Sequence, residues 1–61
     1  MTPTKLYLSF LELFPGMSNQ VSRYEAVKND RNSIRIHTRT GGKLIFTRGD
    51  GRWKLEHDKS E

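Results

Sequence analysis

Residues 33–40 read SIRIHTRT, residues 43–47 read KLIFT, and residues 52–57 read RWKLEH. In each segment apolar side chains alternate with polar ones, which is the pattern of a β-strand with one face against a core. We therefore predict a three-stranded antiparallel sheet over residues 33–57, with one apolar and one polar face. The residues predicted for its apolar face are Ile34, Ile36, Leu44, Phe46, Trp53 and Leu55.

Cationic side chains occupy most positions between these apolar residues. If the apolar residues share one face, the cations must share the other, where only one acid accompanies them. Such a surface can contact phosphates, and binding would then weaken steeply with salt. The alternative is an ordinary solvated face, because long cationic side chains cover exposed sheets well. The candidate nucleic-acid-binding residues are Arg35, His37, Arg39, Lys43, Arg52 and Lys54.

Two glycine-containing turns are expected to set the register. A three-residue loop over residues 40–42, with its last glycine in the left-handed conformation, places Ile36 opposite Phe46. A two-residue turn at residues 49–50, with its glycine first, places Phe46 opposite Trp53. Trp53 is then the largest side chain of the apolar face. We expect Trp53→Ala to unfold the protein, because truncating a buried aromatic costs about 3–5 kcal/mol.

The N-terminal segment predicts a helix over residues 2–15. Thr2 can cap the first amides, and Pro3 suits the first helical position. The helix should end at Phe14-Pro15-Gly16, because the residue preceding a proline disfavours the helical conformation and a glycine follows. Apolar residues at helical spacing are Leu6, Phe10 and Leu13.

Residues 17–28 allow two interpretations. Met17, Val21 and Tyr24 follow helical spacing, which favours a second short helix, and the alternative is an edge strand over Val21–Val27. The predicted fold is therefore α+β, a single small domain over residues 1–61. An N-terminal helix packs on a three-stranded antiparallel β-meander, because a sheet with one apolar face needs a covering layer.

Composition narrows the functional classes. The chain has 61 residues, no cysteine, a formal net charge of +4 and a pI near 9.9. A basic chain favours acidic partners such as nucleic acid or an acidic protein surface. No apolar run approaches the about 20 residues that span a bilayer. The N-terminus lacks the pattern of a secretory signal, so we expect a cytoplasmic location and no membrane partner.

Catalytic and metal-binding patterns are not evident in the sequence. It shows no paired carboxylates, no nucleophile with a base and no glycine-rich phosphate loop. His37 and His57 lie on segments where no further ligands converge with them. We therefore expect a protein that is not an enzyme and that needs neither a metal nor another cofactor.

Three short stretches resemble small proteins of unknown function from bacterial phages and mobile elements. They are residues 32–36, 43–47 and 53–56, and they follow a helix that ends in Leu13-Phe14-Pro15. The resemblance implies an accessory protein that regulates or inhibits a host system. The sequence differs from that pattern in its turns, and the resemblance identifies no site residue.

Two functions therefore stay open. The first is a small basic module that contacts nucleic acid through its sheet. The alternative is a phage-type inhibitor or adaptor that docks on an acidic host protein, or adds a strand at an exposed edge over Ile34–Thr40 or Arg52–His57. The composition also leaves a homodimer open.

Overall fold

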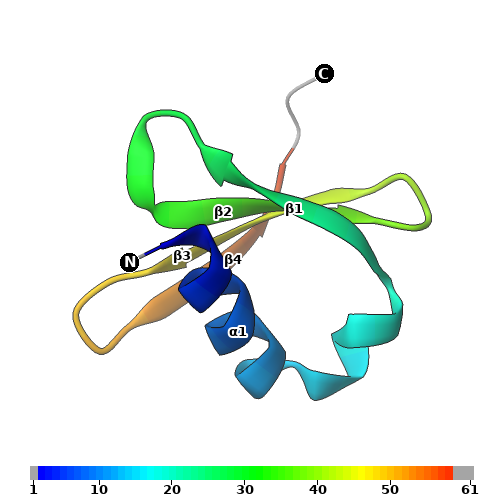
Figure 1. Cartoon of the computed structure of the whole chain (residues 1–61), viewed down its shortest axis with the longest axis horizontal. Coiled ribbons are helices and arrows are strands. Elements are labelled where there is room, and N and C mark those ends of the chain that lie inside the picture. Colours follow the sequence, from blue (N-terminus) through cyan, green and yellow to red (C-terminus); the bar gives the residue numbers. More distant parts are fainter. Residues whose placement is uncertain (1, 59–61) are drawn as a thin grey trace.

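The computed structural model describes residues 2–58 and has an α+β fold. Helix α1 lies against one face of a twisted four-stranded antiparallel sheet (Figure 1). The strands follow one another in the order β1-β2-β3-β4, so the sheet is a meander. Within the described residues, no helix is both long and apolar enough to cross a membrane. The elements are α1 (Pro3–Leu13), a 3₁₀ turn η1 (Pro15–Asn19), β1 (Val21–Val27), β2 (Asp30–Thr38), β3 (Lys43–Arg48) and β4 (Trp53–His57).

Helix α1 begins and ends where the sequence indicates. The Thr2 hydroxyl accepts a hydrogen bond from the Lys5 amide at 3.2 Å, and Pro3 occupies the first turn. The Phe14 amide donates to the Phe10 carbonyl at 2.8 Å before Pro15 ends the helix. The predicted helix over residues 2–15 is thus confirmed, with slightly narrower bounds.

The preferred helix over residues 17–28 is wrong, and the edge-strand alternative is right. A register shift between Val21 and Arg23 marks a β-bulge in β1. The bulge lets Val21 and Tyr24 both face α1, although a regular strand would place residues three apart on opposite faces. The apolar spacing of β1 therefore imitates a helix, and the sheet has four strands where three were expected.

The turns differ from the predicted ones, yet the predicted faces are kept. Ile36 pairs with Leu44, and Phe46 pairs with Leu55, so each hairpin is shifted by two residues from the expected register. A shift of two keeps every side chain on its own face. The glycines with positive φ are Gly41, at 91°, and Gly51, at 71°, where Gly42 and Gly49 were expected.

The core lies between α1 and the sheet. Phe10 and Phe46 meet edge to face with their ring centroids 5.6 Å apart, and both side chains are fully buried. Tyr7 stacks on Tyr24 at 4.3 Å and so joins α1 to β1. The buried apolar residues are Leu6, Phe10, Val21, Ile34, Ile36, Leu44 and Phe46.

Trp53 faces α1 as expected but lies at the margin of the core. Its ring is 5.2 Å from that of Phe14 and 6.4 Å from that of Phe46, yet 48% of the residue is exposed. Helix α1 packs mainly on β1, β2 and β3, whereas Trp53 belongs to β4, at one edge of the sheet. The cost of about 3–5 kcal/mol applies to a fully buried aromatic side chain. Truncating the half-exposed Trp53 removes less buried surface, so Trp53→Ala is no longer expected to unfold the protein.

Candidate binding surfaces

The sheet face opposite α1, here called the helix-free face, carries the polar residues of all four strands. The register places Glu25 of β1 beside Arg35 of β2, and Arg35 beside Ile45 of β3. Ile45 in turn lies beside Glu56 of β4. The face thus has an aliphatic residue at its centre. Its other main residues are Arg23, Ser33, His37, Lys43, Thr47, Arg52, Lys54 and Asp58.

Glu25 organises the β1 side of this face. Its carboxylate lies 2.9 Å from His37 Nε2 and 3.1 Å from Arg35 Nη1, and a longer contact of 3.5 Å reaches Arg23. The hydrogen bonds from His37 and Arg35 lower the pKa of Glu25 from 4.5 to about 2. A carboxylate in this state can only accept hydrogen bonds, so the Nε2 atom of His37 carries a proton.

Arg35 connects the two edges of the sheet. While its Nη1 contacts Glu25, its Nε donates to Asp58 Oδ2 at 2.8 Å, just beyond β4. Glu25 and then Asp58 raise the pKa of Arg35, which keeps its guanidinium charged. Two carboxylates from opposite edges of the sheet, those of Glu25 and Asp58, therefore neutralise the cations at its centre. We call Arg23, Glu25, Arg35, His37 and Asp58 the central ion-pair network.

The predicted site residues divide into two groups. Arg35 and His37 belong to the central ion-pair network, and Lys54 pairs with Glu56 at 3.2 Å in a contact that leaves both side chains largely exposed. The other three form no ion pair with any residue in the described part of the chain. These are Arg39 in the β2–β3 loop, Lys43 at the start of β3 and Arg52 before β4.

The sequence reasoning therefore placed the cations on one face but missed the acids that join them. Glu25 was missed because β1 was interpreted as a helix, and Asp58 because it follows the last strand. The alternation of Arg23, Tyr24 and Glu25 in the edge-strand alternative was the signal that could have found Glu25. Among the described residues, the face carries five Lys and Arg side chains against three carboxylates: Arg23, Arg35, Lys43, Arg52 and Lys54 against Glu25, Glu56 and Asp58. Arg39 adds a sixth cation from the adjoining β2–β3 loop.

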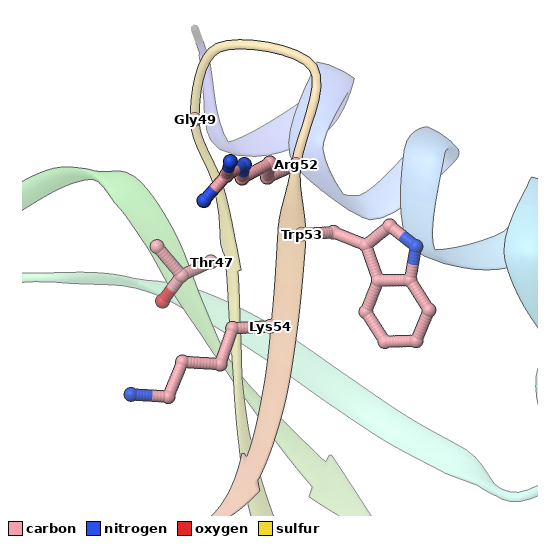
Figure 2. Close-up of a pocket in the computed structure, with 5 residues that line it drawn as sticks. All are labelled: Thr47, Gly49, Arg52, Trp53 and Lys54. Atoms are coloured by element: carbon pink, nitrogen blue, oxygen red, sulfur yellow. The ribbon is translucent and has the colours of Figure 1, made fainter.

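A shallow hollow lies at the β3–β4 hairpin (Figure 2). Arg52, Thr47 and Lys54 point to one side of the hairpin, whereas Trp53 points to the other, toward α1. The polar groups and the indole therefore do not converge on one ligand position. Elsewhere in residues 2–58, no group of three His, Cys, Asp or Glu side chains is placed to hold a metal ion.

Strand β4 forms an open edge of the sheet. Of the two edges expected to accept a strand, Ile34–Thr40 is covered by β1, so that expectation is wrong, whereas Arg52–His57 lies on an edge strand. Trp53 is 48% exposed on this strand. Unpaired backbone groups and an exposed aromatic residue are features of a surface that binds another polypeptide.

Comparison with known proteins gives no identification. No family model matches the chain, and no curated protein or solved structure matches it either. The geometry of its own residues is therefore the basis for a functional proposal.

Proposed function

We propose that this protein is a small, non-catalytic binding module whose helix-free face contacts the phosphates of nucleic acid. The observation that carries the proposal is the excess of cations on the described part of that face, where five Lys and Arg side chains, with Arg39 in the adjoining loop, stand against three carboxylates. We also propose a cytoplasmic location for the protein.

The cations of the central ion-pair network are already paired with Glu25 or Asp58, so we propose that phosphates bind at the two ends of the face. Arg39 and Lys43 lie at the end formed by the β2–β3 loop, and Arg52 and Lys54 lie at the β3–β4 hairpin. These side chains can turn toward phosphates without leaving a carboxylate buried and unpaired. Binding through phosphates would be largely independent of sequence. The described part of this face also has no Phe, Tyr or Trp on which a base could stack.

The proposal is tested by NMR titration of labelled protein with duplex DNA and with single-stranded RNA. We expect amide shifts at both ends of the helix-free face at about 50 mM salt, and we expect them to fade at about 200 mM because phosphate binding releases counterions. Arg39→Ala, Lys43→Ala and Arg52→Ala should each weaken binding and reduce the salt slope by about one.

Lys28→Ala is the matched control, because it removes one cation from the β1–β2 turn, at the opposite edge of the sheet from Arg52 and Lys54 and at the opposite end from Arg39 and Lys43. Arg35→Ala is a poor probe, since it also removes one partner of Glu25 and one partner of Asp58. Absence of shifts with both nucleic acids would reject the proposal, as would an equal effect of Lys28→Ala.

The second candidate is a phage-type inhibitor or adaptor that docks on a host protein. It is favoured by three large apolar residues in contact with solvent: Leu8 is 54% exposed, Leu13 38% and Trp53 48%. Protein docking predicts one or two dominant residues and a mild dependence on salt. In a titration with a candidate host protein, Leu13→Ala or Trp53→Ala should then weaken binding strongly, and Arg39→Ala should weaken it little.

A further inference from the structure

The open edge of β4 presents its hydrogen-bonding groups in a regular order. At one end of the β3–β4 pair, the Gly49 amide donates to the Arg52 carbonyl at 2.9 Å. At the other end, the Asp58 amide donates to the Lys43 carbonyl at 2.9 Å. In an antiparallel pair, residues that bond to the neighbouring strand alternate with residues that point away. The backbone groups directed outward from β4 therefore belong to Trp53, Leu55 and His57.

The charges along this strand are arranged in two halves. Arg52 and Lys54 are cationic, whereas Glu56 and Asp58 are anionic, and Leu55 lies between them. All four charged residues belong to the helix-free face, since they alternate with Trp53, Leu55 and His57. A strand of this kind is complementary in charge to a second copy of itself that runs in the opposite direction.

We propose that two copies of this protein pair along β4, antiparallel and with Leu55 opposite Leu55, to form one continuous eight-stranded sheet. Lys54 of each copy then lies opposite Glu56 of the other. Trp53 of each copy lies opposite His57 of the other, so every outward-directed residue meets another outward-directed residue. Arg52 of each copy comes beside Asp58 of the other, whose carboxylate already holds Arg35 of its own chain.

Neighbouring registers are less favourable. A shift of two residues in one direction places Lys54 opposite Lys54, and a shift in the other direction places Glu56 opposite Glu56. A shift of one residue would bring outward-directed backbone groups against inward-directed ones. A parallel arrangement in register places each charge beside its like. Like charges directly opposite one another destabilise a strand pair, whereas opposite charges stabilise it.

The apolar side of β4 supports the same arrangement. Trp53 is 48% exposed and Leu55 is half-buried, and α1 packs mainly on the other three strands. In the paired sheet both α1 helices lie on the same face, because the two-fold axis is perpendicular to the sheet. The two copies of Trp53 then lie on the same face of the joined β4 strands, between the two α1 helices. The proposal does not depend on nucleic-acid binding.

The test is the oligomeric state of the full chain in the absence of any ligand. Sedimentation velocity should show a monomer–dimer equilibrium between about 10 µM and about 1 mM, because a single strand pair makes a small interface. The chain has one tryptophan, so its emission should shift to shorter wavelength as the dimer forms and Trp53 is buried.

Two charge reversals test the register. Lys54→Glu and Glu56→Lys each turn both central cross-strand contacts into like-charge contacts, and each should raise the dissociation constant about tenfold or more. In an equimolar mixture of the two variants these contacts are again complementary, so the mixture should dimerise as the wild type does. The Lys54 and Glu56 side chains are 68% and 56% exposed, so both variants should fold, and circular dichroism would verify this.

Lys28→Glu is the control for net charge, because it changes the charge as Lys54→Glu does but lies in the β1–β2 turn. It should dimerise like the wild type. A wild-type chain that stays monomeric to about 1 mM would overturn the proposal and leave the edge to a different polypeptide, since even weak specific pairs associate in this range. Dimers that neither charge reversal weakens would also overturn it, because they would form through another surface.

Discussion

Glu25 is the residue on which the central ion-pair network depends. Its carboxylate contacts three cationic or protonated side chains from two strands, and among them His37 and Arg35 lower its pKa to about 2. Asp30 also has a lowered pKa, because the Asn32 amide and the Ser33 hydroxyl donate to its carboxylate. Both acids are therefore held in their ionised form by the fold.

The lowered pKa of Glu25 predicts a dependence of stability on pH. A carboxyl group with a depressed pKa in the folded state stabilises that state above its unfolded pKa, here 4.5, and this contribution is lost as the pH falls toward about 2. The melting temperature of the wild type should therefore fall across this window. Glu25→Gln should lower the melting temperature by a few degrees at pH 7 and should flatten its pH dependence, as measured by circular dichroism.

Glu12→Gln is the matched control, because Glu12 lies on the exposed side of α1 and forms no ion pair among residues 2–58. It should keep the wild-type pH profile. If Glu25→Gln had the same profile as Glu12→Gln, the central ion-pair network would contribute nothing to folding.

The secondary structure elements show which parts of the fold a sequence pattern can specify. The period-two pattern of β2, β3 and β4 predicts their faces correctly, because Ile34, Leu44 and Leu55 all lie on the side of α1. The same pattern cannot distinguish registers that differ by two residues, since they bury the same side chains. Strand β1 was misinterpreted because its bulge breaks the period. The same error hid the acid that pairs with Arg35 and His37, because Glu25 lies on β1.

The β3–β4 hairpin provides a direct test of the observed register. Gly51 has a φ of 71°, a conformation that costs other L-residues about 1–2 kcal/mol, and a Cβ atom there would meet nothing within 4 Å. Gly51→Ala should therefore destabilise the protein by about 1 kcal/mol through backbone strain alone. Gly49 has equally open space around it and no positive φ, so Gly49→Ala should be nearly neutral.

Denaturant unfolding of the two variants measures this difference. The turn expected from the sequence, with Gly49 in the strained position, predicts the opposite order of stabilities. A larger loss in Gly49→Ala than in Gly51→Ala would therefore contradict the hairpin geometry described above.

The described residues form one core, and on the helix side of it two residues of α1 are fully buried. These residues, Leu6 and Phe10, pack against the sheet and are fully buried, whereas Leu8 of the same helix is 54% exposed to solvent. A domain this small has a total stability of only about 3–5 kcal/mol. Its sheet and its helix should therefore unfold together.

This cooperativity predicts very different effects for two truncations on α1. Phe10→Ala should cost about 3–5 kcal/mol, because it removes a buried ring that packs on Phe46, and this equals the whole expected stability. Leu8→Ala removes an exposed side chain of the same helix and should change stability by less than about 0.5 kcal/mol. In NMR spectra, Phe10→Ala should lose the dispersed amide signals of β2 and β3 as well as those of α1. Retention of the sheet signals would show that the sheet is stable without its helical cover, and that the burial of Ile34, Ile36 and Phe46 does not depend on α1.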